Sequence, residues 1–275
     1  MAGPTARVMG IVNATPDSFS DGGRFVAPDA ALAHARRLIA EGADILDIGG
    51  ESTRPGATPV LQVEELERVI PLITAIRTES AVPISIDTFK PAVARAAGAA
   101  GATLWNDVTA LRGAPDAPDV AAALGCEVVL MHMLGEPGTM QDAPRYDDVV
   151  AEVEAFLLQR VEVAVAAGVA RDRLWLDPGI GFGKTLEHNL ALLRALPRFV
   201  ALGLPVLLGA SRKRFIAALD PTATDAGDRL GGSLAAALAG SRAGVAAVRV
   251  HDVRETVQAL KVEAAVDGSA GGGTD

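Results

Sequence analysis

Short apolar segments alternate with longer amphipathic segments along the whole chain. The short segments are rich in Val, Ile and Leu and lack polar alternation, which is typical of parallel strands buried on both faces. In the longer segments apolar residues recur every three or four positions; Leu32, Ala35 and Leu38 do so in residues 29–41, which stop before Gly42. The predicted strands are residues 7–13, 44–49, 82–87, 103–106, 127–132, 174–177, 206–209 and 247–251.

The strict alternation of strands and helices indicates the class of fold. The predicted helices are residues 29–41, 63–76, 91–100, 117–124, 147–167, 186–196, 229–243 and 252–265. Eight strand–helix pairs in 275 residues predict an α/β protein with a (β/α)8 TIM barrel, because such barrels typically have about 250 residues. We expect one domain over residues 1–267 and a disordered, Gly-rich tail at 268–275. An open doubly wound sheet is the alternative, since strand order cannot be read from a sequence.

Seven of the predicted strands end in, or lead into, polar residues that a buried core does not require. The first is the most pronounced, because Asn13 ends an apolar strand and a polar, Gly-ended loop follows at residues 15–23. The carboxyl ends of all strands in a barrel converge on one mouth, where ligands bind. The other polar strand ends are Asp47 with residues 51–54, Asp87, Asn106, Asp177, residues 211–214, and Arg249 with His251.

Each of these residues also has a purely structural interpretation. Asp87 and Asp252 could be helix N-caps, and Asp47, inside its strand, could be a buried structural carboxylate. His132 and His251 follow apolar strands and could be satisfied core histidines; we favour that interpretation for His132 and not for His251. The prediction of a binding site therefore rests on the agreement of many strand ends.

Composition and charge exclude several classes of function. The net charge of −9, the pI of about 5.0, the 4% of aromatic residues and the lack of a basic block argue against a nucleic-acid partner. No apolar run is long enough to span a membrane, and no signal peptide is evident, so we expect no membrane partner and a cytoplasmic location. The single cysteine, Cys126, lies in an apolar segment and is interpreted as a packing residue.

The polar strand ends fall into two chemical sets. Asp87, Asn106, Asp177 and Lys213 can supply paired hydrogen bonds to a flat heterocycle, because a carboxylate accepts two parallel N–H bonds and an Asn both donates and accepts. A second set, formed by Asn13, Arg249 and His251, can bind an anion or a metal–phosphate group. A heterocycle and a diphosphate in one pocket suggest a substrate with an activated, transferable group.

Two long segments carry a resemblance to a known family. Residues 10–23 (GIVNATPDSFSDGG) and 43–56 (ADILDIGGESTRPG) are similar to the two signature segments of dihydropteroate synthases. The remaining blocks of that family match in order at residues 83–88, 106–109, 177–184, 211–214 and 249–252. The resemblance spans roughly residues 7–265. It implies a TIM barrel that joins (7,8-dihydropterin-6-yl)methyl diphosphate to 4-aminobenzoate and releases diphosphate.

The resemblance also implies roles for individual residues. It gives Asn13 as the ligand of Mg²⁺, and Asp21, Lys213 and Arg249 as the catalytic residues, with Asp21 stabilising a cation at the pterin methylene. The loops at 15–23 and 52–58 close over the site. The residues implied to bind the pterin diphosphate are Thr53, Asp87, Asn106, Asp177, Lys213, Arg249 and His251. Those implied to bind 4-aminobenzoate are Phe19, Thr53, Arg54, Pro55, Phe182 and Arg214.

One position departs from part of the family. Some members have Ser after the Lys of the Ser-Arg-Lys block, and its hydroxyl can bind the aminobenzoate carboxylate; here the residue is Arg214. Backbone N–H groups at the following helix start, or Arg214 itself, can take that role. The family is often homodimeric, which implies a homodimer here. The rival functions are a methyltransferase that passes a methyl group from methyltetrahydrofolate to a corrinoid, and a non-catalytic pterin-binding homologue.

Overall fold

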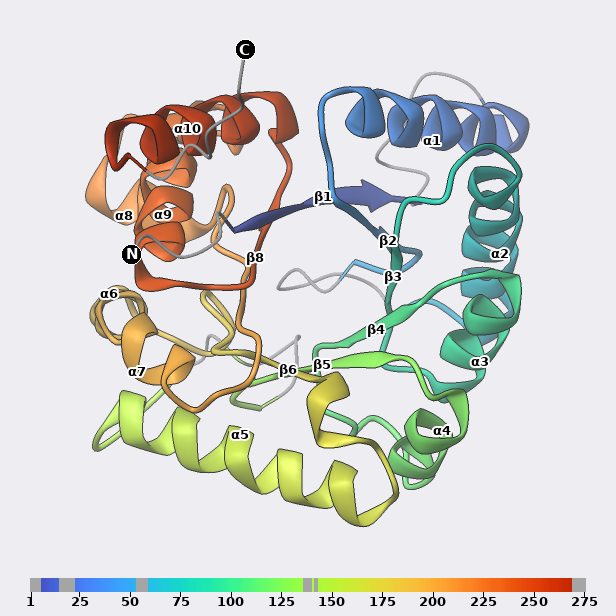
Figure 1. The fold of residues 1–275 in the computed structure, drawn as a ribbon, viewed down its shortest axis with the longest axis horizontal. Helices are drawn as coiled ribbons and strands as arrows, with labels where there is room; N and C mark the ends of the chain where they lie inside the picture. Colours follow the sequence, from blue (N-terminus) through green and yellow to red (C-terminus); the bar gives the residue numbers. More distant parts are fainter. Residues whose placement is uncertain (1–5, 15–22, 53–58, 136–139, 141–142, 269–275) are drawn as a thin grey trace.

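In the computed structural model, parallel strands form a closed barrel within a ring of helices (Figure 1). The structure describes residues 6–14, 23–52, 59–135, 140 and 143–268, and of residues 23–28 the backbone alone. The strands are β1 (Arg7–Asn13), β2 (Ile45–Gly49), β3 (Ile84–Asp87), β4 (Leu104–Asp107), β5 (Glu127–Met131), β6 (Leu174–Asp177), β7 (Leu207–Leu208) and β8 (Ala247–Val250). They form an 8-stranded sheet in the order β6-β5-β4-β3-β2-β1-β8-β7, with parallel pairing throughout.

The two ends of this sheet meet. An isolated parallel bridge joins Leu176 of β6 to Val206, directly before β7, and the Leu176 N–H donates to the Pro205 carbonyl at 2.8 Å. The sheet is therefore a barrel, and the TIM-barrel prediction is confirmed in preference to the open doubly wound sheet.

Helices follow every strand and cover the outside of the barrel. Their bounds are α1 (Gly23–Ala40), α2 (Gln62–Glu79), α3 (Pro91–Ala100), α4 (Ala117–Leu124), α5 (Val149–Ala166), α6 (Leu186–Arg194), α7 (Leu196–Val200), α8 (Arg214–Leu219), α9 (Leu230–Ala243) and α10 (Val253–Val266). Figure 1 shows α1 to α4 in succession along one side of the ring, with α5 to α10 completing it.

Apart from small shifts at the ends of elements, three details differ from the sequence prediction. The helix predicted from residue 29 begins at Gly23. The helix predicted over 186–196 is two helices, α6 and α7, which meet at Ala195. Pro197 lies in the first turn of α7, where its missing N–H costs nothing, whereas within one continuous helix it would remove a hydrogen bond. The six-residue helix α8 was not predicted, because it is too short to show apolar periodicity.

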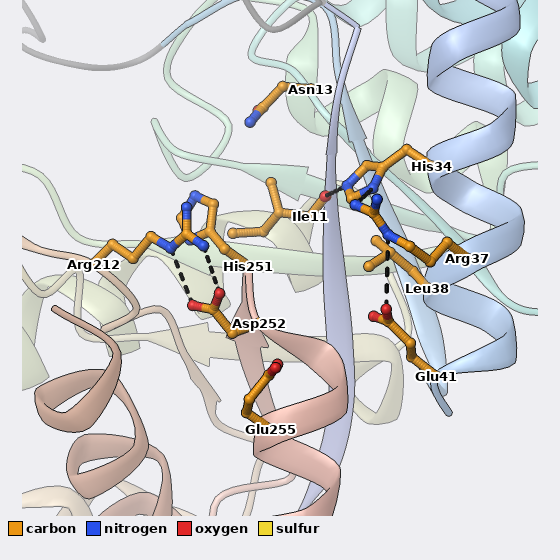
Figure 2. A pocket seen from close by; sticks show the side chains of 10 residues that line it. All are labelled: Ile11, Asn13, His34, Arg37, Leu38, Glu41, Arg212, His251, Asp252 and Glu255. Carbon is orange, nitrogen blue, oxygen red and sulfur yellow. Dashed lines mark hydrogen bonds and ion pairs between the residues drawn. The ribbon is translucent and has the colours of Figure 1, made fainter. Parts of the chain in front are cut away.

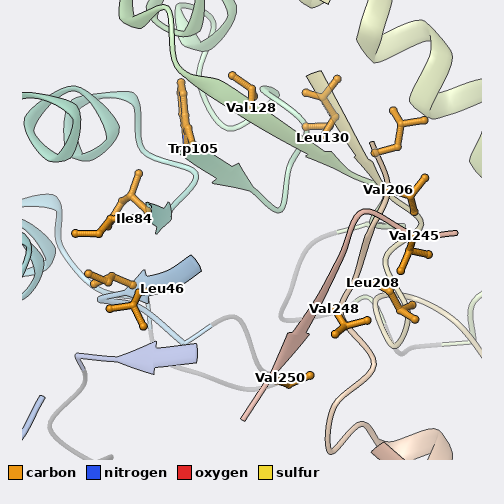
Figure 3. Packing of buried hydrophobic residues seen from close by; sticks show 14 of the residues in the cluster. Leu46, Ile84, Trp105, Val128, Leu130, Val206, Leu208, Val245, Val248 and Val250 are labelled. Atoms are coloured by element: carbon orange, nitrogen blue, oxygen red, sulfur yellow. The ribbon is translucent and has the colours of Figure 1, made fainter. Parts of the chain in front are cut away.

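Buried apolar residues form two layers, one on each face of the strands. The larger layer packs the outward strand residues, such as Leu46, Trp105 and Leu208, against the helices (Figure 3). The smaller layer contains strand residues alone and therefore fills the inside of the barrel. Its buried members are Met9, Ile45, Leu104, Val129, Trp175, Leu207 and Ala247.

The strand period of two residues places the polar strand ends directly above this apolar plug. Two positions further along the strands, the inward-facing residues are Ile11, Asp47, Asn106, Met131, Asp177, Gly209 and Arg249. Asp87 ends β3 and is paired in register with Gly49 and Asn106 of its neighbours. We call the carboxyl end of the barrel the mouth. The seven inward-facing residues above the plug, together with Asp87, are called the polar level.

Candidate active site at the mouth of the barrel

Arg249 joins three strands across the polar level. Its Nε donates to Oδ2 of Asp47 at 2.5 Å, and its Nη2 donates to Oδ2 of Asp87 at 2.7 Å. Burial alone would lower the pKa of Arg249, but the two carboxylates outweigh it and raise the pKa above its usual range. Arg249 is therefore a permanent cation that holds two buried carboxylates close together.

Asp87 has one oxygen ready for a ligand. The residue is 9% exposed, and Oδ1 has no hydrogen-bond partner among the described residues. Burial raises the pKa of Asp87 to about 7, and Arg249 opposes this effect whereas Asp47 adds to it. A buried acceptor without a partner is costly, so a ligand N–H at this position would gain a full hydrogen bond.

Asn106 and Asp177 extend the polar level on either side of β5. The Asn106 amide nitrogen lies 3.4 and 3.5 Å from the two carboxylate oxygens of Asp47. Oδ1 of Asp177 accepts the Gly179 N–H at 2.7 Å, and burial raises the pKa of this carboxyl. Both side chains are buried at the mouth, as a pocket for a flat heterocycle requires.

Lys213 and Phe182 come together from two different loops. Nζ of Lys213 lies 4.0 Å from the centroid of the Phe182 ring, which is a cation–π contact. Gly181, directly before Phe182, has a φ of +82°, and a Cβ at that position would lie 3.0 Å from Cδ of Lys213. Glycine is therefore needed here both for the backbone angle and for the close approach of the lysine.

The loop after β7 is held in an unusual conformation. Arg212 has a φ of +56°, and its backbone N–H donates to Oγ of Ser233 at 2.8 Å. Nη1 of Arg229 donates to the Arg212 carbonyl at 3.0 Å, while Nε of Arg212 donates to Asp252 at 3.0 Å. These contacts stabilise the left-handed residue that precedes Lys213.

His251 and Asn13 line a common cleft between α1 and the start of α10. Nδ1 of His251 is 3.0 Å from the Ser211 hydroxyl, which also accepts the His251 backbone N–H at 3.3 Å. Figure 2 shows His34 and Arg37 on the α1 side of β1, with His251 on the opposite side. The cleft thus brings together Asn13, which ends β1, and His251, which directly follows β8, whereas Arg249 does not line it.

A buried Lys–His pair was not identified as part of the site from the sequence. Lys184 is 4% exposed; its Nζ lies 3.0 Å from Nδ1 of His132 and donates to the Phe182 carbonyl at 2.9 Å. Burial and the nearby Lys213 charge lower the pKa of Lys184 to about 7, although Asp177 opposes this. Burial and then the Lys184 charge lower the pKa of His132 to about 3. His132 is buried and packs edge-on against Phe156, as expected for a core histidine.

Several predicted site residues lie outside the described residues. These are Phe19, Asp21, Thr53, Arg54 and Pro55, together with most of the two loops at 15–23 and 52–58. The tail beyond Gly268 is also outside them. Arg214 is described: it is the first residue of α8, and its side chain is exposed.

The described residues contain neither a cluster of metal ligands nor a membrane-spanning helix. Among them, no three or more His, Cys, Asp or Glu side chains form a group that could hold a metal. The amide oxygen of Asn13 is nevertheless a donor that suits Mg²⁺, an ion that often takes one or two protein oxygens and completes its shell with phosphate and water. No helix in the described part of the chain is long and apolar enough to cross a membrane.

Comparisons with known proteins place this geometry in a family. Residues 9–251 match the family model described as "Pterin binding enzyme". The dihydropteroate synthase of Escherichia coli K12 is 49% identical over 255 residues, which cover 93% of this chain and 89% of that protein.

Solved structures agree in fold as well as in sequence. A Xanthomonas albilineans dihydropteroate synthase with 4-aminobenzoic acid is 55% identical, with a TM-score of 0.90, and the match covers 96% of this chain and 93% of that one. A structure of the X. albilineans enzyme in complex with 7,8-dihydropteroate is 52% identical, with a TM-score of 0.87 and coverage of 96% and 94%. A Yersinia pestis enzyme with a sulfonamide drug is 45% identical, with a TM-score of 0.90 and coverage of 96% and 95%.

Proposed function

The chain belongs to the pterin binding enzymes and, within them, to the dihydropteroate synthases, and on this premise we propose how its barrel mouth carries out the transferase reaction. The reaction joins (7,8-dihydropterin-6-yl)methyl diphosphate to 4-aminobenzoate and yields 7,8-dihydropteroate and diphosphate, in folate biosynthesis. The observation that carries the proposal is the polar level, in which buried carboxylates and an amide lie directly above an apolar plug.

The pterin is bound by this polar level. Oδ1 of Asp87 needs a donor, and the amino-pyrimidinone edge of a pterin offers adjacent N–H groups. Asn106 on β4 and Asp177 on β6 supply further acceptors and donors. Lys213, held over the Phe182 ring, provides a cation at the edge of the same pocket. Thr53 is assigned to the substrate by the family resemblance alone.

The diphosphate is bound on the side of strands 1 and 8. Asn13 and His251 line one cleft there. The Arg249 cation lies on β8, two residues before His251. We propose Asn13 as a ligand of Mg²⁺, because its amide oxygen and the phosphate oxygens together form the oxygen-rich donor set this ion prefers. When bound, Mg²⁺ neutralises negative charge on the diphosphate.

Transfer then follows from the charges at the mouth. The bond between the pterin methylene carbon and the diphosphate oxygen breaks, and its electron pair leaves with the diphosphate. Arg249 and His251 offset the negative charge that grows on this leaving group, and Asp21 stabilises the methylene cation. The amine of 4-aminobenzoate attacks the carbon to form the C–N bond, and its excess proton is released to solvent. No covalent bond to the protein is required.

The second substrate binds beyond the pterin. Phe182 offers a ring beside Lys213, and Arg214 at the start of α8 offers an exposed cation for the aminobenzoate carboxylate. The family resemblance adds Phe19, Thr53, Arg54 and Pro55 to this pocket. Closure of the loops at 15–23 and 52–58 would exclude water that could otherwise trap the cation.

The decisive experiment is a coupled diphosphate-release assay with identification of the product. Purified protein with Mg²⁺, pterin diphosphate and 4-aminobenzoate should release diphosphate and form dihydropteroate, and no release should occur without the amine beyond slow hydrolysis. Product no greater than in a protein-free control would refute the function.

The same experiment separates this function from its rivals. A methyltransferase would need methyltetrahydrofolate and a corrinoid acceptor, and a non-catalytic homologue would bind pterin without releasing diphosphate. The relatives found support dihydropteroate synthesis over both. Omitting Mg²⁺ tests the metal, sedimentation tests the proposed homodimer, and cell fractionation tests the proposed cytoplasmic location.

A further inference from the structure

We propose that Asp47 is a positioning residue that fixes both Arg249 and Asn106, and so sets the geometry of the pterin and diphosphate halves of the site together. The inference rests on the proposed function, because it concerns the substrates of that reaction. It assigns a role to a carboxylate that the sequence left open as merely structural.

The placement of Asp47 separates it from the carboxylates that can face a ligand. It lies in the middle of β2, in register with Ile11 of β1 and Ser85 of β3, and its side chain is 0% exposed. Asp87 and Asp177 instead end their strands at the mouth. Asp47 therefore acts on a bound substrate through its neighbours.

The first neighbour is Arg249, which Asp47 holds by one nitrogen. Oδ2 of Asp47 accepts from Nε of Arg249 at 2.5 Å, while Nη2 of the same guanidinium reaches Asp87 at 2.7 Å. Two contacts at different nitrogens fix the plane of a guanidinium, because its donors have a rigid geometry. Loss of the Asp47 contact would leave Arg249 held by Oδ2 of Asp87 alone, so the plane of its guanidinium would no longer be fixed.

The second neighbour is Asn106, whose amide orientation Asp47 selects. An ionised carboxylate can only accept hydrogen bonds, so the group that faces Asp47 at 3.4–3.5 Å must be the Asn106 NH2. The Asn106 carbonyl oxygen is then turned away from Asp47 and is presented as an acceptor. A ligand donor group, such as a pterin N–H, matches that orientation.

The conclusion is that one buried carboxylate couples two substrate-binding side chains on different strands. After burial, the negative charge of Asp47 also contributes to the raised pKa of Asp87. The expected signature of this role is a loss of pterin diphosphate binding that leaves 4-aminobenzoate binding nearly unchanged. A residue that only maintains the fold would affect both substrates and the melting temperature together.

The test compares Asp47→Asn with Asp44→Asn as a matched control. Asp44 lies just before the same strand, at the opposite end from the mouth, where it accepts the Val8 N–H at 2.7 Å. We expect Asp47→Asn to weaken binding of pterin diphosphate at least about tenfold by calorimetry, with the KM for 4-aminobenzoate changed less than about threefold. Asp44→Asn should leave both unchanged. Pterin affinity within twofold of wild type in Asp47→Asn would overturn the inference.

A double-mutant cycle distinguishes positioning from a general effect on the fold. If Asp47 acts through Arg249, the effects of Asp47→Asn and Arg249→Gln on pterin diphosphate affinity should be clearly less than additive in the double variant. Strict additivity would overturn the inference. Wild-type protein that binds no pterin diphosphate would instead refute the proposed function, so the two failures are distinguishable.

A second measurement needs no Asp47 variant and covers the case in which Asp47→Asn does not fold. In ¹⁵N-labelled wild-type protein, the side-chain NH2 of Asn106 should exchange with deuterium more slowly than the NH2 of the half-buried Asn13. The reason is that the Asn106 NH2 faces the buried carboxylate of Asp47. The Asn106 signal is identified by its absence in Asn106→Ser. Exchange as fast as at Asn13 would contradict the proposed orientation.

Discussion

Nζ of Lys184, in the loop that follows β6, lies 3.0 Å from Nδ1 of His132, which directly follows β5, and both side chains are buried. Burial lowers the pKa of His132 to about 3, so the imidazole is neutral near pH 7 and can accept a hydrogen bond from the lysine. The pair connects the β5 and β6 ends of the mouth without an ion pair. The protonated, charged form of Lys184 destabilises the folded protein, because burial disfavours a charge.

This pair gives the protein a stability that increases with pH. Burial lowers the pKa of Lys184 from 10.5 to about 7, so between these values the unfolded chain binds a proton that the folded protein lacks. The free energy of unfolding should therefore rise with pH across this window, by on the order of 1 kcal/mol per pH unit. Urea titrations measure it. The slope should be reduced in Lys184→Met and retained in Lys261→Met, an exposed residue of α10; equal slopes in both would contradict the assignment.

Pterin affinity should depend on pH near neutrality through Asp87. Burial raises the pKa of this carboxyl to about 7, and only the ionised form accepts at both oxygens. Lowering the pH from 8 to 6 reduces the ionised fraction about tenfold, so the affinity for pterin diphosphate should fall by about the same factor. Calorimetry in the two buffers measures it, with Asp87→Asn as the reference that should lack this dependence. An equal pH dependence in that variant would assign the effect to another group.

Gly181 and Gly203 form a matched pair of substitution sites. Both have a left-handed φ, +82° and +79°, but a Cβ at 181 would lie 3.0 Å from Cδ of Lys213, whereas nothing lies within 4 Å of one at 203. Alanine at either position should cost about 1–2 kcal/mol of stability. Only Gly181→Ala should also lower kcat/KM, by roughly tenfold, since it displaces the lysine. Equal activities in the two variants would show that the contact does not matter for turnover.

Lys90 neutralises a carboxylate that has no access to water. Its Nζ bonds Glu65 at 2.5 Å and Glu51 at 2.6 Å, and the Glu65 side chain is 0% exposed. Glu65 lies on α2, whereas Glu51 accepts the Val60 N–H at 3.0 Å. Lys90→Met should therefore destabilise the protein by about 3–5 kcal/mol in urea unfolding, because it leaves a buried charge unpaired. Lys261→Met serves again as the control, and a loss below about 1 kcal/mol would mean that the carboxylate is solvated.

Sulfonamides should compete with 4-aminobenzoate. They combine an arylamine with an anionic group, and a sulfonamide is bound in the similar structure of the Yersinia pestis enzyme. We expect the KM for 4-aminobenzoate to rise linearly with sulfonamide concentration while kcat stays constant. Initial rates at several concentrations of both compounds measure this, and inhibition that does not depend on aminobenzoate would place the drug elsewhere.

The barrel and the location of its site could be predicted from the sequence because both depend on local pattern. Short apolar runs mark the strands, and a polar residue at the end of a buried run, such as Asn13 or Asp177, indicates the mouth whatever the strand order. The structure brings Asp87 and Arg249 into direct contact as part of the same site. The substrate assignments of individual residues stay predictions.

What could not be predicted depends on which inward residues meet across the barrel. Asp47 and Arg249 are separated by 202 positions, and no local pattern indicates that they pair. The contact between Lys184 and His132 likewise depends on how the loop after β6 lies beside the end of β5. A polar residue inside a strand, as Asp47 is inside β2, was the available signal, and its partner could not be read from it.

The barrel closes through a seam with little backbone support. β7 has only Leu207 and Leu208, and the isolated bridge between Leu176 and Val206 joins it to β6. Asp177 and Lys213 are attached on opposite sides of this seam. Few backbone hydrogen bonds therefore fix the distance between these two side chains, which depends mainly on how the flanking loops and helices pack.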